Sequence, residues 1–439
     1  MFKTLINAFK VQDIRRRLLY TFFILVVVRL GSLITVPGIS ADAIREYMQN
    51  ALGDSLNIFS SFTGGSFEQM SIFALSVTPY ITASIIIQLL TIAIPALEEL
   101  QKDGEDGRKK IASITRYVTI GLSLIESIAM AVGFGKSGLI KNSAQLSTLH
   151  YVVCIIVVIA ALTAGSAVLM WLGERITENG VGNGISIVLL INIISGMPSD
   201  FATLYSTFVA PKTPAKGVLA AVIILAILIV MVVLVCFLQD GERRIPVQYS
   251  QKVSGRRTVG GQSTNIPLKV NTAGVMPIIF ASSLMQFPVI IAQLFGKSYE
   301  WTRYLSSSYW CRVEAPKYSI GLLVYIVLLI IFAYFYTSIT FNPIEVADNL
   351  KKAGGVIPGI TPGKSTSEYL NKILNYIVFI GAVGLLIIAL IPIMCTGFFN
   401  ASVSFGGTSI IIIVGVVLET LKQIESQMCN RYYKGFLSE

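Results

Sequence analysis

Residues able to carry acid–base or metal chemistry are scarce in this sequence. His150 is the only histidine among the 439 residues, which excludes a histidine-based catalytic triad and a histidine-rich metal site. The five cysteines are irregularly spaced, and no two of them form a CxxC pair. Neither a disulfide framework nor a metal site is indicated by such spacing. The residue types therefore argue against a catalytic or metal-binding centre.

One short string matches part of a nucleotide-binding loop. GKST at 363–366 has the ending of a phosphate-binding loop, but that loop also needs a glycine five residues before Gly363. Pro358 occupies that position, so the glycines and prolines of this stretch are better interpreted as turns.

Two ionisable residues lie inside long apolar runs, Arg29 and Glu126. Ionisable groups at membrane depth are costly and face protein or water. They are compatible with polar contacts between helices or with a proton or ion relay. A relay normally needs several such groups, and the sequence offers no chain of carboxylates, so structural contacts are favoured.

The apolar runs predict a membrane protein. The chain is 54% hydrophobic and 13% charged, against about 25% charged residues in a soluble protein. A membrane-spanning helix needs about 20 mainly apolar residues. Ten runs qualify, and they lie near 18–36, 70–95, 112–133, 151–172, 183–199, 217–238, 270–294, 319–340, 373–394 and 406–423.

The positive charges are distributed unequally between the two sides of these ten spans. If the N-terminus is cytoplasmic, the inside segments hold 24 lysines and arginines and the outside segments hold 9. This asymmetry predicts a multi-pass protein with both termini cytoplasmic. It also explains the net charge of +10 without nucleic acid.

Ten spans divide into five plus five, and an odd number of spans reverses the second half. The prediction is an all-α membrane protein of two inverted five-helix halves with a functional path between them. The predicted parts are an amphipathic N-terminal helix (1–17), the first half (18–199), an external connection (200–216), the second half (217–423) with cytoplasmic loops at 239–269 and 341–372, and a cytoplasmic tail (424–439).

Residues 51–62 are partly apolar but too short to cross a membrane, and Gly64 and Gly65 follow them. This pattern is typical of a re-entrant half-helix, which is tolerated only when buried in protein or lining a cavity. A surface loop with one helical turn fits the pattern equally well.

Long sequence motifs resemble the SecY/Sec61-alpha family of protein-conducting channels over essentially the whole chain. They are NIFSSFTGGSFEQMSIFALSVTPYITASIIIQLL at 57–90, GNGISI at 182–187, GRRTVGGQSTNIPLKVNTAGVMPIIFASS at 255–283, ADNLKKAGGVIPGITPGKST at 347–366 and FGGTSIIIIVGVVLETLKQIESQ at 405–427.

The resemblance implies a passive channel that is not an enzyme and needs no cofactor. Such a channel passes unfolded secretory polypeptides across the bacterial cytoplasmic (inner) membrane, binds their signal sequences and releases apolar segments sideways among the membrane lipids. The implied partners are the small subunits SecE and SecG, the motor ATPase SecA and the ribosome, with no specific DNA.

The resemblance also implies roles for individual residues. The pore ring falls on Val77, Ile81, Ile185, Leu189, Ile279 and Ile412. The plug falls on residues 51–62, with Ala51, Leu52, Leu56, Ile58, Phe59 and Phe62, and its hinge on Gly64 and Gly65. The lateral gate lies between spans two and three and spans seven and eight, where Thr82, Gln88 and Glu126 are the polar candidates.

The basic cytoplasmic loops are the expected docking surface for the motor or the ribosome. The candidate residues are Arg243, Arg244, Lys252, Arg256, Arg257, Lys351, Lys352, Thr361 and Lys364. The family usually reads GIRPG where this sequence reads GITPG at 359–363. Lys364 lies nearby, but a lysine does not offer the fork of donors that an arginine does, so the resemblance does not carry the arginine contact over to Thr361.

Two other functions stay open on the residues alone. A secondary transporter with inverted repeats would place convergent polar groups at the membrane midplane, and the spans contain few. A membrane-embedded enzyme would need paired intramembrane carboxylates or further histidines, which the sequence lacks.

Overall fold

The computed structural model describes most of the chain. The described residues are 9–39, 63–136, 148–210, 214–249, 252–254, 257–259, 263–294, 300–306, 309–311, 316–399 and 407–434. The predicted plug, 51–62, lies outside them.

Each of the ten predicted spans overlaps a helix of the structure. The helices are α2 (Gln12–Gly31), α5 (Thr78–Ala93), α7 (Gly104–Lys136), α8 (Thr148–Asn179), α9 (Gly184–Leu204), α10 (Pro214–Asp240), α11 (Met276–Leu294), α13 (Ile320–Thr340), α15 (Lys364–Phe399) and α16 (Gly407–Lys434). Six helices of the described part are long and apolar enough to cross a membrane by themselves. The pair α5 and α6 (Pro95–Lys102), bent by 105°, passes the same test together. The chain is a predominantly helical, multi-pass membrane protein.

The helices pack as two halves with the same pattern of neighbours. In the first half, α2 contacts α8 and α9, and α5, α7, α8 and α9 contact one another in sequence order. In the second half, α10 contacts α15 and α16, and α11, α13, α15 and α16 again follow in order. The first-to-fourth and first-to-fifth contacts therefore recur in both halves. This recurrence supports an internal repeat of five helices.

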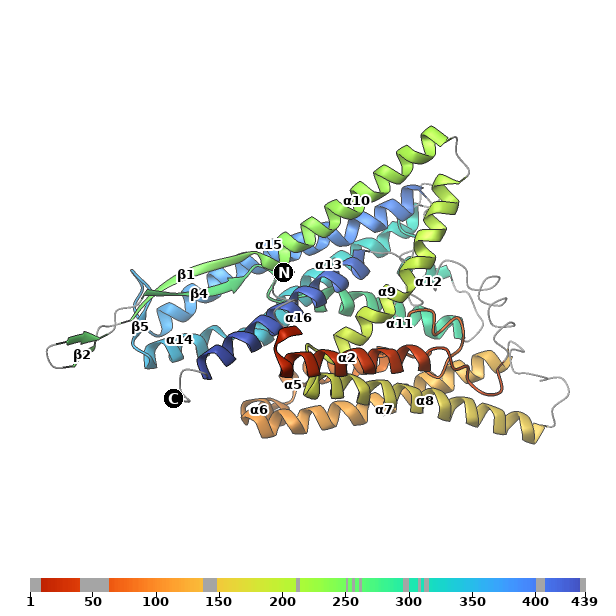
Figure 1. The fold of residues 1–439 in the computed structure, drawn as a ribbon, viewed down its shortest axis with the longest axis horizontal. Helices are drawn as coiled ribbons and strands as arrows, with labels where there is room; N and C mark the ends of the chain where they lie inside the picture. Colours follow the sequence, from red (N-terminus) through yellow and green to blue (C-terminus); the bar gives the residue numbers. More distant parts are fainter. Residues whose placement is uncertain are drawn as a thin grey trace.

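The two halves meet through a small set of helices. Contacts between them run from α9 to α16, from α7 to α11 and from α5 to α11. Figure 1 shows α2, α5, α7 and α8 on one side of the molecule and α10 and α15 on the other, with α9, α11 and α16 between them.

The second half carries a small β-sheet at one end, which we call the sheet end. Strand β1 (Glu242–Tyr249) pairs antiparallel with β4 (Ser263–Lys269) and, on its other edge, with β5 (Gly355–Val356). A separate hairpin pairs β2 (Lys252–Ser254) with β3 (Arg257–Val259). Figure 1 places β1, β4, α14 (Pro343–Lys352) and the C-terminus at this end. The two predicted cytoplasmic loops, 239–269 and 341–372, are thus joined in one sheet.

Apolar side chains under the sheet fix it to the helices. Ile245 and Val247 of β1 are buried beside Leu350 of α14 and Leu370 of α15. The flanking Arg243 and Arg244 are exposed. Ile245 and Val247 share the covered face of the strand and Arg244 points to the opposite, solvent face. Arg243 has the parity of Ile245 but is exposed near the start of the strand.

Most helices begin or end several residues from the predicted bounds, and three of these differences bear on the architecture. The second span begins at Thr78 rather than 70, because residues 63–77 form turns in which Met70 and Ser76 have positive φ angles of 41° and 52°. Helix α2 starts at Gln12 and runs unbroken into the first span, so part of the predicted surface helix belongs to it. Helix α9 continues to Leu204 and is followed by the short helix η3 (Tyr205–Val209), within the predicted external connection.

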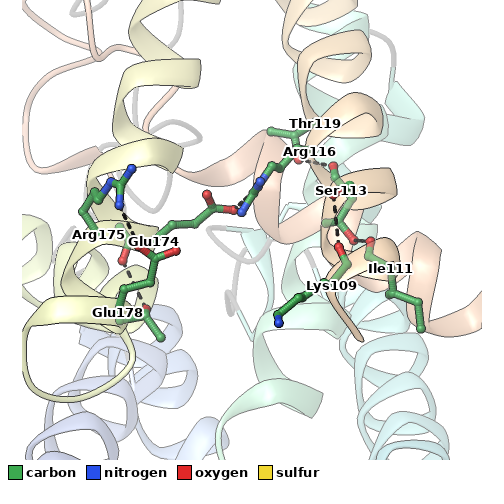
Figure 2. Close-up of polar contacts among 11 residues, drawn as sticks. Lys109, Ile111, Ser113, Arg116, Thr119, Glu174, Arg175 and Glu178 are labelled. Carbon is green, nitrogen blue, oxygen red and sulfur yellow. Dashed lines mark hydrogen bonds and ion pairs between the residues drawn. The ribbon is translucent and has the colours of Figure 1, made fainter. Parts of the chain in front are cut away.

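Helices α7 and α8 are joined by an ion pair (Figure 2). Arg116 Nε donates to Glu174 Oε1 over 2.7 Å. A second pair within α8 joins Arg175 and Glu178 at 2.8 Å. The first of these links two neighbouring spans of the first half.

Candidate functional site

The six predicted ring residues occur in one hydrophobic cluster. Ile81 is partly buried against this cluster, and the other five are buried members of it. They are Val77, Ile185, Leu189, Ile279 and Ile412. Since α5 and α9 belong to the first half and α11 and α16 to the second, the structure brings side chains of both halves together.

Helix α9 places two of these residues one turn apart. Its first turn is capped by Asn183, whose side chain accepts a hydrogen bond from the Ser186 amide at 3.4 Å, as helix N-caps do. Gly184 lies so close to α8 that an added Cβ would overlap the Gly173 carbonyl. Ile185 and Leu189, four residues apart, therefore share one face of a helix held tightly against its neighbour.

Val77 reaches the cluster from the irregular segment before α5. It is the residue immediately before the helix, and Ile81 follows one turn later. Pro79 in the first turn suits a helix start, because its missing N–H has no partner in that position. Because Val77 is the last residue of the irregular segment 63–77, the conformation of that segment sets the position of the Val77 side chain.

Such an apolar cluster can restrict passage between two compartments. Narrow apolar constrictions are poorly wetted and act as gates by dewetting. Their side chains also offer no strong polar contact to a passing chain. The six side chains carry no polar group that could act as an acid, a base or a metal ligand.

The predicted lateral-gate residues lie on the helices that contact α11 from the first half. Thr82 Oγ1 donates to the Thr78 carbonyl at 3.1 Å, and Gln88 Nε2 donates to Ser84 Oγ at 3.2 Å. Gln88 Oε1 is buried without a hydrogen-bond partner. Glu126 on α7 is half-buried. Among the described residues, no hydrogen bond joins these three side chains to one another, so their polar atoms are not satisfied as one network.

The candidate docking residues surround the sheet end. Arg243 and Arg244 are exposed on β1, and Arg244 also pairs with Glu242 at 2.7 Å. Lys351 and Lys352 are exposed in the last turn of α14. Lys252 and Arg257 lie in β2 and β3, and Arg256 lies outside the described residues. Four of these basic residues, Arg243, Arg244, Lys351 and Lys352, are exposed near the sheet.

Thr361 and Lys364 lie at the start of α15. Thr361 is exposed, and its carbonyl accepts a hydrogen bond from Thr366 Oγ1 at 2.9 Å. Lys364 is 91% exposed and 4.0 Å from Glu368. This hydrogen bond uses the backbone of residue 361 and leaves the exposed threonine side chain at the surface.

Both predicted hinge glycines have left-handed backbone. The φ angle is 61° at Gly64 and 78° at Gly65, a region that glycine enters without steric cost. The Gly64 carbonyl accepts hydrogen bonds from Arg29 Nη1 and Ser195 Oγ, both at 3.4 Å. Arg29 therefore makes a polar contact between helix α2 and the segment before α5. Of the two interpretations offered for this residue, a structural contact or an ion relay, the hydrogen bond supports the structural contact.

Several polar residues near the cluster were not predicted from the sequence. Asn192 on α9 donates from Nδ2 to Ser76 Oγ at 3.1 Å, and both residues are buried. The available signal was weak: Asn192 interrupts an apolar run three residues after Leu189, on the same helix face. Nothing in the sequence identifies its partner 116 positions away.

The part of the chain that the structure describes contains no cluster of three or more histidine, cysteine or acidic residues able to hold a metal ion.

Comparison with known proteins gives a consistent result. The SecY family pattern matches residues 71–421. The protein translocase subunit SecY of Streptomyces galbus is 43% identical over 445 residues, covering 98% of each chain. The protein of the same name in Bacillus subtilis strain 168 is 41% identical over 444 residues, covering 100% of each chain.

Solved structures show the same fold. One, described as the structure of a protein-conducting channel, has a TM-score of 0.61 at 18% identity and covers 95% of this chain and 93% of its own. Another, Sec61 in the canine ribosome–channel complex from the endoplasmic reticulum, has a TM-score of 0.57 at 18% identity, with the same coverage. The match along nearly the full length of the translocase subunits and along residues 71–421 places this chain in the SecY family.

Proposed function

We propose that this chain forms the protein-conducting channel of a Sec translocase. An unfolded secretory polypeptide passes between the two halves, through the ring of Val77, Ile81, Ile185, Leu189, Ile279 and Ile412. The observation that carries the proposal is that these six side chains, drawn from four helices and both halves, lie in one apolar cluster.

The channel works passively. An apolar ring fits diverse side chains without binding any of them strongly, and it seals against water and ions when no chain occupies it. The energy for transport then comes from outside the channel. A cytosolic motor, SecA, or a translating ribosome supplies it, which makes this chain a channel subunit and not an enzyme.

Apolar segments leave the channel sideways. The contacts of α5 and α7 with α11 are the interhalf contacts that would have to part to open a path to the lipid. The hydrogen bonds of Thr82 and Gln88 stay within α5, so they do not hold this seam closed. Segments apolar enough to favour lipid then partition into the bilayer.

The sheet end faces the cytoplasm, and both termini lie on that side. The excess of positive charge on the inside segments supports this orientation. In a bacterial cell the chain resides in the cytoplasmic membrane with SecE and SecG. The exposed basic residues of β1 and α14 offer the motor or the ribosome a docking surface of complementary charge. Loops 239–269 and 341–372 act as one docking unit because β1 pairs with β5.

Reconstitution tests this function. Vesicles containing this chain, SecE and SecG are given SecA, ATP and a radiolabelled secretory precursor with an intact signal sequence. The expected result is protease-protected precursor that requires both ATP and this chain, with vesicles lacking the chain as control. Absence of protection with all components present would contradict the proposal. Uptake of small solutes by vesicles containing this chain alone would favour a secondary transporter instead.

A further inference from the structure

Ser76, beside the ring residue Val77, has a backbone conformation that is unfavourable for its residue type. Its φ angle is 52°, in the left-handed region where a Cβ crowds the following carbonyl. Residues in such regions persist only when the surrounding structure holds them. Since Val77 follows directly, whatever holds Ser76 also places Val77 in the ring.

A buried hydrogen bond holds Ser76. Asn192 Nδ2 donates to Ser76 Oγ at 3.1 Å, and the two residues are 3% and 1% exposed. Asn192 lies three residues after Leu189 and seven after Ile185, on the same face of α9. This one hydrogen bond thus joins the segment that leads into α5 to helix α9. The two together supply four of the six ring residues.

A second contact holds the beginning of the same segment. Ser195 Oγ, one turn after Asn192, lies 2.8 Å from the Asn192 carbonyl oxygen and 3.4 Å from the Gly64 carbonyl oxygen, so its single proton is shared between the two. Arg29 of α2 donates to the Gly64 carbonyl at 3.4 Å. A Cβ on Gly64 would lie 2.9 Å from Asn192 Cα and 2.8 Å from the Asn192 carbonyl oxygen. The segment is therefore fastened to α9 at both of its ends.

We propose that Asn192 and Ser195 are positioning residues of the channel, resting on the function proposed above. They fix the 63–77 segment on α9 and so keep Val77 and Ile81 in register with Ile185 and Leu189. We call the Asn192–Ser76 and Ser195–Gly64 bonds the ring brace. Neither side chain need touch the passing polypeptide; they determine how tightly the empty ring closes and which signal sequences open it.

Conductance of the resting channel tests the ring brace. Ser76→Ala, Asn192→Leu and the double variant are compared with the unchanged chain in planar bilayers, without and with a signal peptide. Loss of the bond should raise the resting open fraction about tenfold, the change that corresponds to about 1.4 kcal/mol. Ser195→Ala should act in the same direction. Vesicles with these variants should also accept precursors whose signal sequence is defective.

The matched control is Ser199→Ala on the same helix. The Ser199 hydroxyl is exposed and donates only to the Gly196 carbonyl one turn earlier, so this variant should keep the unchanged chain's conductance and selectivity. The double variant Ser76→Ala/Asn192→Leu should show the effect of one change and not the sum of two, because both remove the same bond.

The outcomes separate the brace from the function itself. Failure of the proposed function would appear as an unchanged chain that neither opens with signal peptide nor translocates precursor. Failure of the brace alone would leave the unchanged chain active and Ser76→Ala and Asn192→Leu indistinguishable from Ser199→Ala. If Asn192→Leu lowers the yield of folded protein, Ser76→Ala, which removes a single oxygen atom, decides the comparison.

Discussion

At the scale of single residues, Gly64 and Gly65 have similar backbone but different surroundings. Both have positive φ angles, 61° and 78°. A Cβ on Gly64 would overlap the backbone of Asn192, whereas nothing lies within 4 Å of a Cβ on Gly65. The pair therefore separates the cost of a left-handed conformation from the cost of displacing α9.

Alanine substitutions measure these two costs. Gly65→Ala should destabilise the protein by about 1 kcal/mol, the cost of a side chain in left-handed backbone. Gly64→Ala should cost about 1–3 kcal/mol more, because the segment must move off α9. Thermal unfolding in detergent, followed by loss of helical circular dichroism, gives the ranking. Equal midpoints for the two variants would show that Gly64 does not pack against α9 as described.

At this scale, the sequence allows a residue to be assigned to a helix face where apolar residues recur at helical spacing. Ile185 and Leu189 could be assigned to one face of a helix from spacing alone, but their roles in a ring came only from the family resemblance. Asn192 and Ser195 were missed, because the partner of a buried polar side chain depends on tertiary packing. Their contacts with Ser76 and Gly64 span 116 and 131 positions.

At the scale of elements, the ion pair between Arg116 and Glu174 links two neighbouring spans, α7 and α8. The two side chains are 43% and 20% exposed, and Figure 2 shows them reaching across from α7 and α8. The pair within α8, Arg175 and Glu178, is more exposed, at 44% and 54%. It serves as an internal comparison.

Double-mutant cycles compare the two pairs. Because solvent screens partly exposed charges, the Arg116–Glu174 coupling should be about 0.5–1 kcal/mol. The coupling of Arg175 with Glu178 should be about 0.3 kcal/mol, typical of pairs three or four apart on one helix. Unfolding midpoints of the single and double alanine variants supply both values. A larger coupling within α8 than between α7 and α8 would contradict the assigned role.

The sheet end offers a second contrast between elements. Ile245 of β1 is buried, with 2% of its surface exposed, and Arg243, two residues earlier on the same strand, is exposed. Ile245→Ala should destabilise this end by about 2–5 kcal/mol, seen as faster proteolysis of the β1–β4 region. Arg243→Ala should leave stability within about 0.5 kcal/mol and weaken binding of SecA or the ribosome in a salt-dependent way. If Arg243→Ala binds both partners normally at low salt, β1 is not the docking strand.

The positions of the helices were predictable because long apolar runs are a strong signal. The start of α5 was not, since residues 70–77 continue the apolar run of the span while their backbone forms turns. The sheet was also missed. Strand β1 reads ERRIPVQY, with a proline and two arginines, and its pairing with β5 joins two loops separated by four helices of the described chain.

At the scale of the whole molecule, two halves with the same pattern of neighbours both contribute to the apolar cluster that contains the proposed ring. The contacts α9–α16 and α5–α11 each join equivalent helices of the two halves. Separation of α5 and α7 from α11 can therefore open one side while α9 and α16 stay in contact. The inverted arrangement was predictable from the count of spans, but the pairing of helices required the structure.

Crosslinking of a stalled secretory chain tests the central claim most directly. Single cysteines replace Ile81, Ile185 or Ile279 in a cysteine-free background, and Ile229, 55% exposed on α10, serves as the control position. The account predicts that a translocation intermediate with a cysteine within its stalled segment forms disulfide crosslinks at all three ring positions and none at 229. Absence of crosslinks at all three, or equal crosslinking at 229, would contradict a polypeptide path through the ring.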